Sequence, residues 1–328
     1  MAITIMPEIP SQNRRGEMNS LQAYFIKLML RLTFKHKNFG KMTPEEMRAD
    51  FRASAAKLYK ASREVGRTTL DADGIPAEEV TPLSRSIRRT VLYLHGGGYV
   101  LGSAETHRPI TEALAGQADA RIIAPDYRLA PEHKFPAAVE DAVRVYRWLL
   151  AEGTAPADIA VAGDSAGGGL AFALCLALRD RDIDLPGAVV GLSPWTDLTG
   201  SGDSVKSNAW SDPMLKPDGI ENLATTYLAP GEDRTTPLAS PLFGKFNGFP
   251  PTLIHVGSSE ILLDDSTRLA EKLIEAGVEV ELDIWDGMPH VWHLMAAQLP
   301  EARGALAKIA TFLKAHVGEI DNDAATAA

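Results

Sequence analysis

Hydrophobic and polar positions along the chain follow two alternating patterns. Short apolar runs such as 159–163 and 252–257 recur, and each has the length and continuity of a buried strand. Between such runs, as in 136–151 and 302–316, apolar residues repeat every three or four positions, which is the period of an amphipathic helix. Strands that alternate with helices predict an α/β fold with a mostly parallel central sheet flanked by helices.

The remaining elements of the sheet domain are predicted from the same two patterns. Asp73-Gly74 is a turn signal between two entry strands within 65–80. Further strands are expected at 89–95, 120–125, 187–192 and 278–284, and further helices at 105–118, from 167 onward and at 266–276.

Two regions of helical pattern lie outside this alternation. Leu21–Leu32 has a broad apolar face with lysine and arginine beside it, and a second helix is expected to begin at Pro44, where Thr43 can cap it and Glu46 completes a capping box. Residues 208–228 predict a helix inserted between two strands. We interpret these regions as a cap over a pocket. For Leu21–Leu32, a position on a membrane surface is the less favoured alternative.

The predicted domain division follows from these elements. Residues 1–60 form the N-terminal part of a helical cap and residues 201–228 its second part. Residues 61–200 and 229–320 form the α/β core, and 321–328 are a flexible tail. A length of 328 residues is sufficient for one such core with an accessory lobe.

Composition and charge exclude several classes of protein. A net charge of −10 without a sizeable cluster of lysine and arginine argues against nucleic acid as a partner. No apolar run approaches the length of a membrane span, and Met1–Ser20 lacks the pattern of a secretory signal, so we expect no membrane span and a cytoplasmic location. Cys175 is the only cysteine, which excludes an intrachain disulfide, and we expect it to be inert core.

The most informative stretch is the junction between the strand 159–163 and the helix that follows it. It reads Gly163-Asp-Ser165-Ala166-Gly167, the G-x-S-x-G pattern of a sharp strand-to-helix turn that lifts a serine hydroxyl clear of the sheet. Glycines are required because the turn leaves no room for side chains on either side of the serine. The first backbone amides of the helix, beginning with Ala166, would lie beside Ser165 and could stabilise an oxyanion.

A second pattern upstream supports a nucleophilic role for this serine. The strand 89–95 runs directly into Gly96-Gly97-Gly98, and a loop without β-carbons can bring its amides close to a reacting carbonyl oxygen. An HGGG sequence is a known source of oxyanion donors in lipases and esterases. A flexible turn is the alternative.

A nucleophilic serine needs a histidine base and an acid that orients it, in the chain order Ser, Asp/Glu, His. The strand 252–257 is followed by Glu260 and Asp264, and the strand 278–284 by His290. The carboxyl ends of parallel strands share one edge of a sheet, so these residues are expected near the serine. His293 is a competitor for the role of base, but a turn or helix can carry it away from the serine.

Four motifs together resemble the hormone-sensitive-lipase family of bacterial carboxylesterases. They are HGGGY at 95–99, DYRLAPE at 126–132, GDSAGG at 163–168 and GMPH at 287–290, and the similarity runs over roughly residues 60–316. The resemblance implies an α/β-hydrolase fold with a helical cap, in which residues 61–200 and 229–320 are the catalytic core. It implies Ser165 as nucleophile, His290 as base, and Gly97, Gly98 and Ala166 as oxyanion donors. It also implies short- to medium-chain acyl esters as substrates and a homodimer that pairs through an edge strand near 278–284.

One position departs from the family pattern. Glu260 stands where the family usually has an aspartate, so Glu260 and Asp264 both remain candidates for the third catalytic residue. Glu260 is favoured, because Asp264 and Asp265 stand where the helix 266–276 should begin, and an aspartate there has a structural role as an N-cap. A glutamate can reach the histidine if its loop retreats by roughly 1 Å.

Other polar groups are expected to be structural. His95 precedes the glycine loop and should brace it, and His255 lies within a strand. Asp126, Arg128 and Glu132 are interpreted as an ion-pair network that holds their loop. No spacing of histidines, cysteines or carboxylates resembles a metal site, and no glycine-rich loop has the phosphate-binding form, so neither a metal nor a cofactor is expected.

The sequence therefore predicts a serine carboxylesterase that acts on a small-molecule ester through an acyl-enzyme, with Ser165, Glu260 and His290 as its catalytic residues. One alternative is a related hydrolase of an amide, a carbonate or an acetylated small molecule. Another is a non-catalytic ligand receptor on the same fold, as in the plant gibberellin receptors, which resemble the family but lack the catalytic histidine.

Overall fold

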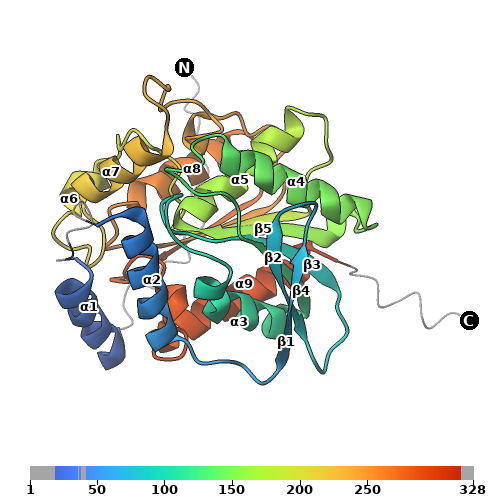
Figure 1. The fold of residues 1–328 in the computed structure, drawn as a ribbon, viewed down its shortest axis with the longest axis horizontal. Coiled ribbons are helices and arrows are strands. Elements are labelled where there is room, and N and C mark those ends of the chain that lie inside the picture. Colours follow the sequence, from blue (N-terminus) through green and yellow to red (C-terminus); the bar gives the residue numbers. More distant parts are fainter. Residues whose placement is uncertain (1–18, 36, 38–41, 319–328) are drawn as a thin grey trace, which may run out of the picture.

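The computed structural model describes residues 19–35, 37 and 42–318. The predicted tail at 321–328 and the first part of the predicted cap, residues 1–18, lie outside the described residues. An eight-stranded sheet forms the centre of the molecule, in the order β1-β2-β4-β3-β5-β6-β7-β8. Figure 1 shows the sheet with helices on both of its faces.

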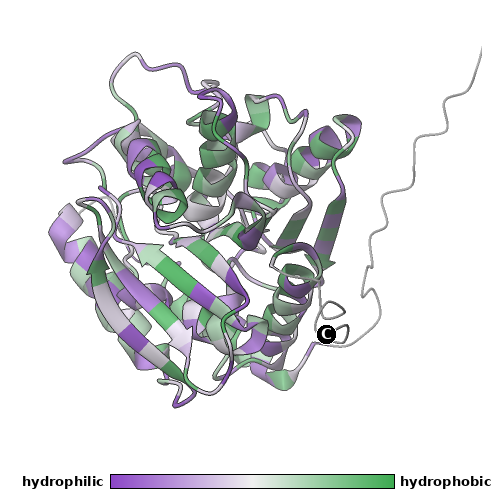
Figure 2. Cartoon of the chain, turned by 90° about the vertical axis from the view of Figure 1, so that its right-hand side faces the viewer, coloured by the Kyte–Doolittle hydropathy of each residue, from purple (hydrophilic) through white to green (hydrophobic). Residues whose placement is uncertain are grey.

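The strands lie close to their predicted positions. Their bounds are β1 Val65–Asp71, β2 Pro76–Pro82, β3 Arg89–Leu94, β4 Ala120–Pro125, β5 Ile159–Asp164, β6 Ala188–Leu192, β7 Thr252–Gly257 and β8 Val280–Trp285. Every residue of β3, β5, β6 and β7 is buried, which is why these strands have continuous apolar sequences. Hydrophobic residues accordingly dominate the middle of the sheet in Figure 2.

The pairing of the strands decides where their ends meet. β1 and β2 form an antiparallel hairpin whose turn contains Asp73 and Gly74, both with positive φ, and β2 pairs antiparallel with β4. All remaining pairs are parallel. The carboxyl ends of β3, β5, β6, β7 and β8 therefore meet at one edge, as predicted.

Two layers of helices cover the sheet. Buried side chains of α4 (Ala137–Ala151), α5 (Ser165–Arg179) and α8 (Leu263–Glu275) belong to the hydrophobic cluster on one face. Those of α3 (Arg108–Ala118), which follows a short 3₁₀ turn at Glu105–His107, and of α9 (Pro300–His316) belong to the cluster on the other face. This two-sided cover is the arrangement that a parallel sheet requires.

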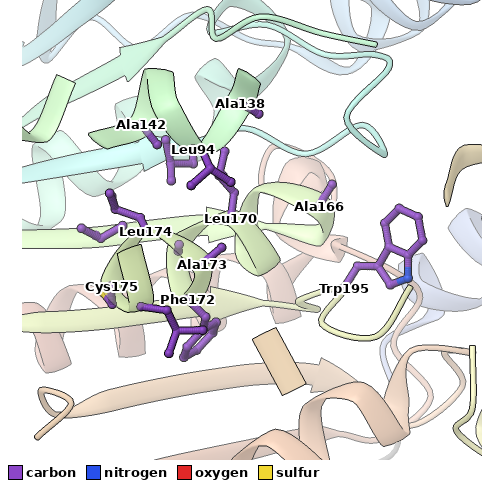
Figure 3. Close-up of a cluster of buried hydrophobic side chains, with 14 of the residues drawn as sticks. Leu94, Ala138, Ala142, Ala166, Leu170, Phe172, Ala173, Leu174, Cys175 and Trp195 are labelled. Atoms are coloured by element: carbon purple, nitrogen blue, oxygen red, sulfur yellow. The ribbon is translucent and has the colours of Figure 1, made fainter. Parts of the chain in front are cut away.

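α5 is the most deeply buried helix. Each of its residues from Ala166 to Leu178 is buried, and its small and aliphatic side chains pack against Leu94, Ala138 and Ala142 (Figure 3). Cys175 lies in this cluster without a disulfide partner, and burial raises the pKa of its thiol far above the usual range. The thiolate form is therefore suppressed, which supports the prediction of an inert core cysteine.

Four helices lie outside the sheet layers. α1 is Leu21–Thr33 and α2 is Pro44–Leu58, and the predicted capping box between Thr43 and Glu46 is present. The prediction of one helix over 208–228 is wrong. A short helix, α6 (Ser204–Ser207), is followed by irregular backbone and then by α7 (Pro217–Tyr227). The Asp212 carboxylate accepts hydrogen bonds from the amides of Met214 and Leu215, which turns the chain before the second helix begins.

The N-terminus of α8 also differs from its prediction. α8 begins at Leu263, so Asp264 and Asp265 lie inside its first turn, and no side chain caps it. Instead, the Asp264 carboxylate accepts the amide of Ser204, and the Asp265 carboxylate accepts the amides of Thr196 and Asp197. Both aspartates are structural, but they stabilise neighbouring segments and not their own helix.

Asp126, Arg128 and Glu132 have a structural role in holding their loop, as predicted, but each has its partner on a different element and they do not form one network with each other. Asp126 accepts the amide of Ala104, Arg128 pairs with Asp141 of α4 at 2.6 Å, and Glu132 pairs with Arg48 of α2 at 2.7 Å. The loop is thereby attached at separate points to its surroundings.

Within the ranges that the structure describes, every helix is too short or too polar to cross a membrane.

Candidate active site

Ser165 lies at the sharp turn between β5 and α5. Its φ of 52° is in the left-handed region, which costs on the order of 1–3 kcal/mol for a residue other than glycine. The glycines of the motif are sterically necessary. A β-carbon at Gly163 would lie 2.2 Å from the carbonyl oxygen of Gly167, and one at Gly167 would lie 2.0 Å from that of Leu94. The turn thus brings the start of α5 against the end of β3.

The glycine loop after β3 lies beside this turn because Asp164 links the two. One carboxylate oxygen of Asp164 accepts the Gly96 amide at 3.0 Å and the Tyr93 hydroxyl at 2.7 Å. The amides of Gly97 and Gly98 donate no hydrogen bond to any residue that the structure describes, and both glycines line the cavity above Ser165. The Ala166 amide is in the first turn of α5, where helix amides have no partner within the helix.

The side chains of Ser165, His290 and Glu260 form a hydrogen-bonded chain. His290 Nε2 lies 2.9 Å from Ser165 Oγ, and His290 Nδ1 lies 2.7 Å from Glu260 Oε2. His290 and Glu260 are buried, so water competes little for these contacts. The three residues predicted from separate stretches of sequence therefore meet at the carboxyl edge of the sheet.

Glu260 has a full set of partners. Its second oxygen, Oε1, accepts the Gly257 amide at 2.6 Å and the hydroxyl of Ser193 at 2.7 Å. The Ser193 hydroxyl in turn accepts the amide of Val291, the residue after His290. Ser193 and Val291 both have positive φ, at 47° and 46°, so two strained residues flank the acid and the histidine. Such strain persists only where the surrounding structure over-determines it.

The environment of His290 favours its protonated form. Burial alone would lower the pKa of His290, but the hydrogen bond and charge of Glu260, with the charges of Asp212 and Asp164 further away, outweigh burial and raise the pKa above its ordinary value. Glu260 thus fixes the ring so that Nδ1 carries a proton and Nε2 faces the serine.

The segment between α6 and α7 holds the Glu260 loop in place. Asn208 Nδ2 donates to the backbone oxygens of Ser258 and Glu260, and the Ser211 hydroxyl donates to that of Ser259. The buried Asp212 carboxylate accepts the Ile261 amide at 3.0 Å. The sequence analysis missed these residues, because only the tertiary fold brings this segment to the loop. The Asp212-Pro213 turn was the one local signal.

A buried ion pair fixes the position of Asp164, which holds the glycine loop. The sequence did not predict this pair. His107 Nε2 lies 3.3 Å from Asp164 Oδ2, with both side chains buried. For each partner, burial opposes the charged form but the other's charge prevails, so the pKa of His107 is raised and that of Asp164 is lowered. No local pattern of the sequence implies a partner for His107, although Asp164 stands inside the serine motif itself.

The other histidines have structural positions. His95 Nδ1 contacts the backbone oxygen of its neighbour Gly96 at 2.9 Å, and burial lowers the His95 pKa to about 3, so this ring is neutral. His255 Nδ1 lies 3.2 Å from His293 Nε2, and His255 Nε2 lies 3.2 Å from Asp283. His293, the competitor for the role of base, is therefore directed into the core beside β7.

A cavity of about 880 Å³ opens above Ser165 and His290. The carboxyl edge of the sheet forms its floor. Its walls include Met47 and Phe51 from α2 and Ile220 and Leu223 from α7. Leu223 covers the glycine loop so closely that a β-carbon at Gly98 would meet it at 2.6 Å. The cavity can thus hold a largely apolar small molecule with a carbonyl group placed near Ser165.

Over the described parts of the chain, no group of three or more histidines, cysteines and carboxylates has the arrangement of a metal site. The hydrogen-bonded chain of serine, histidine and glutamate, beside unoccupied amide donors, is suited to nucleophilic attack on a carbonyl carbon with proton transfer through the imidazole.

Comparison with known proteins gives consistent results. Residues 91–294 match the model of a family described as having the alpha/beta hydrolase fold. The chain is 46% identical over 243 residues to an acetyl-hydrolase of Streptomyces hygroscopicus, over 74% of this chain and 81% of the relative. It is 36% identical over 293 residues to an esterase of Acinetobacter venetianus, over 88% of this chain and 95% of the relative.

Solved structures agree with these relatives. The crystal structure of an esterase from the bacterial hormone-sensitive lipase family superimposes with a TM-score of 0.87 at 40% sequence identity, covering 92% of this chain and all of that one. A hormone-sensitive lipase from a metagenome library superimposes with a TM-score of 0.86 at 37% identity, covering 91% of this chain and 99% of that one. These names do not favour a non-catalytic receptor.

Proposed function

Because the chain belongs to the hormone-sensitive-lipase family of bacterial carboxylesterases and hydrolyses carboxylic esters, we propose that Ser165, His290 and Glu260 are its catalytic triad. The observation that carries this proposal is the continuous chain of hydrogen bonds, at 2.9 Å from serine to histidine and 2.7 Å from histidine to glutamate. Asp264 is the weaker candidate for the acid, because its carboxylate is directed to the Ser204 amide.

The proposed reaction has two half-reactions. Ser165 Oγ attacks the ester carbonyl carbon while His290 Nε2 takes the hydroxyl proton, and the negative charge develops on the carbonyl oxygen. When the carbon–oxygen bond to the alcohol breaks, His290 returns the proton to the departing oxygen. Water then attacks the acyl-enzyme, giving its proton to His290, and the acid leaves as Ser165 regains a proton.

We assign the oxyanion donors to the backbone amides of Gly97, Gly98 and Ala166. Support comes from the absence of other acceptors for the two glycine amides among the described residues, and from the position of Ala166 at the N-terminus of α5. Gly97 has a φ of 122° and Gly98 a φ of 63°, so a side chain at either position would disturb the loop that presents the amides.

We also propose that residues 1–60 and 201–228 act as one cap over the cavity. The described parts of both segments lie outside the sheet and contribute walls of the cavity, such as Phe51 and Leu223. The apolar walls are consistent with short- to medium-chain acyl groups. In support, one further relative, 31% identical, is named an ethyl acetate hydrolase of Pseudomonas putida.

The substrate proposal is tested with p-nitrophenyl esters graded from acetyl to dodecanoyl, with Ser165→Ala as the blank. We expect kcat/KM to be highest for the short and medium acyl groups and to fall for the longest, because the walls that the cap contributes limit the length of acyl chain that the cavity holds. A steady rise of kcat/KM up to dodecanoyl would contradict the proposed substrate class.

β8 is an edge strand of the sheet, so its free backbone groups can pair with a second copy. We propose that a homodimer forms there. Analytical ultracentrifugation of the wild type beside Val280→Pro tests it, because the Val280 backbone faces the free edge while its neighbours pair with β7. A wild-type protein that sediments as a monomer would contradict this assembly. The cytoplasmic location expected from the sequence stays a prediction.

A further inference from the structure

α1 is apolar both on the face that packs against the protein and on the face that is exposed to solvent. Its inner face buries Ala23, Ile26 and Leu30 in a cluster with Trp285 and Trp292. The opposite face is also apolar although it is open to solvent. Its members are Leu21 (75% exposed), Phe25 (72%), Leu32 (65%), Tyr24 (56%), Leu28 (55%) and Met29 (36%). A helix on the surface of a globular protein normally has polar residues there.

The charged residues of α1 itself have a single sign. α1 contains Lys27 and Arg31 and no acidic residue, in a chain whose net charge is −10. At helical spacing both cations fall on one border of the outer face. The Arg31 guanidinium lies 4.5 Å from the centre of the Trp210 ring and donates to the Trp210 carbonyl, and Trp210 is 80% exposed. Trp210 thus extends the apolar surface from α1 to the segment between α6 and α7.

This surface lies close to the entrance of the active-site cavity. Phe34 and Lys35, directly after α1, line the cavity, as do Met214 and Leu215, which follow Trp210 closely in sequence. In Figure 1, α1 lies at the margin of the molecule, beside α2. An apolar ester that leaves a lipid surface in contact with α1 would therefore be close to the entrance of the cavity.

We propose that the outer face of α1, together with Trp210, docks on an anionic lipid surface. The apolar side chains would enter the boundary of the acyl chains, while Lys27 and Arg31 would face the headgroups. Aromatic and aliphatic residues bordered by lysine and arginine are the pattern of a helix that lies in a membrane interface. The inference goes beyond the proposed function, because docking does not depend on which residues form the triad.

A second copy of the chain fits this surface less well. A two-fold interface brings identical patches together, so it would place Lys27 and Arg31 of one protomer near those of its partner. α1 offers no carboxylate to compensate them. Anionic headgroups supply that complement, and the binding they promote is weakened by salt.

The test measures co-sedimentation of the full chain with vesicles. The Ser165→Ala variant is used throughout so that no lipid is hydrolysed. Vesicles contain either phosphatidylglycerol mixed with phosphatidylcholine, or phosphatidylcholine alone. We expect binding to the anionic vesicles, weaker binding to the neutral ones, and a loss of binding at high salt. Phe25→Gln combined with Leu28→Gln should weaken partitioning roughly tenfold or more, because two large apolar groups are removed from the docking face.

Leu83→Gln combined with Ile87→Gln is the matched control, because these side chains are 67% and 48% exposed but lie outside α1. The control should bind like its parent. With Ser165 intact, both double variants should keep wild-type turnover of a water-soluble acetyl ester, since none of the four residues lines the cavity.

Equal binding of the α1 variant and the control would overturn the proposal, as would the absence of binding by the parent protein. If the parent sediments as a dimer without vesicles and the α1 variant as a monomer, this face is an interface between copies and the lipid proposal is wrong. Because binding is read without turnover, the result is separate from the test of the triad.

Discussion

The floor of the active-site cavity consists mainly of hydrogen-bonded polar groups, whereas its cap consists mainly of apolar side chains. On the floor, buried polar groups are held by directional contacts: the Glu260 carboxylate contacts the Gly257 amide, the Ser193 hydroxyl and His290 Nδ1. The cap offers the cavity mainly apolar side chains, such as Phe51 and Leu223. Directional contacts fix the atoms that react, whereas apolar contacts accept many shapes. We therefore propose that the floor determines the reaction and that the cap determines which ester reaches it.

One segment of the proposed cap makes hydrogen bonds with the floor. Asn208 and Asp212 belong to the second part of the proposed cap, yet they hydrogen-bond the backbone around Glu260. Movement of this segment would displace Glu260, the proposed acid of the triad, whereas α1 and α2 have no such contact with Glu260 among the described residues. The floor therefore differs most from α1 and α2, the helices of the cap that make no such contact in the described part of the chain.

The largest effect is expected from Ser165→Ala. Loss of the nucleophile should lower kcat on the order of 10⁶-fold with p-nitrophenyl butyrate, as expected for a residue that acts as a unit with its base. Thermal unfolding should change little, because the hydroxyl faces the cavity and its deletion leaves only His290 Nε2 without that partner. A variant that keeps a measurable fraction of wild-type kcat would remove Ser165 from the role of nucleophile.

Glu260→Gln should lower kcat by roughly 10²–10⁴-fold with a modest change in KM. The glutamine oxygen can still accept from Gly257 and Ser193, but its amide group would then face His290 Nδ1 and select the wrong tautomer.

Asp264→Asn is the matched control, because it makes the same chemical change four residues further along the chain, in the first turn of α8. It should cost about 0.5–1.5 kcal/mol of unfolding free energy, by weakening the contact with Ser204, and leave kcat close to wild type. If the kinetic effect belongs to Asp264 and the stability effect to Glu260, the assignment of the acid is reversed.

The dependence of kcat/KM on pH should show the effect of the Glu260 charge on the pKa of His290. Only neutral His290 can accept the serine proton, so kcat/KM should rise with pH as the ring deprotonates. Because Glu260 raises the pKa of His290, the midpoint should lie above the ordinary imidazole value of about 6.5. In Glu260→Gln the residual activity should rise at a lower pH. A midpoint that is unchanged by this substitution would contradict the electrostatic role.

The smallest effect is expected in the cap. Leu223→Ala enlarges the space above Gly98, so KM for short acyl esters should rise by about threefold to tenfold and longer esters should improve relative to them, with kcat little changed. Leu28→Ala is the control, since this leucine is exposed on α1 and does not line the cavity. A Leu223→Ala variant that loses mainly kcat would break the separation between floor and cap.

The two regions also differ in how much of them could be predicted from the sequence. On the floor, each strand and the loop or turn after it form a local signal, so the sequence predicts β5 with Ser165 directly after it and β7 with Glu260 in the loop that follows. The irregular backbone between α6 and α7 was missed because Asp212 turns the chain through its own side chain, which overrides the apolar period of 208–228.

Long-range partners could not be predicted for a related reason. The partners of Asp264, Arg128 and His107 lie on segments far away in sequence, and no local pattern specifies them. Asp164 shows the limit most clearly. It stands within the serine motif, but its role in holding the glycine loop depends on Tyr93, Gly96 and His107, which meet it only in the folded sheet.

The central claim is that the floor, through Ser165, carries the reaction. Its most direct test is mass spectrometry of peptides from the wild-type enzyme after reaction with a fluorophosphonate, with Glu260→Gln treated in parallel. We predict a single adduct on Ser165, formed more slowly in the variant because the histidine base is less well oriented. An adduct on any other serine, or equal labelling rates in the two proteins, would contradict the account.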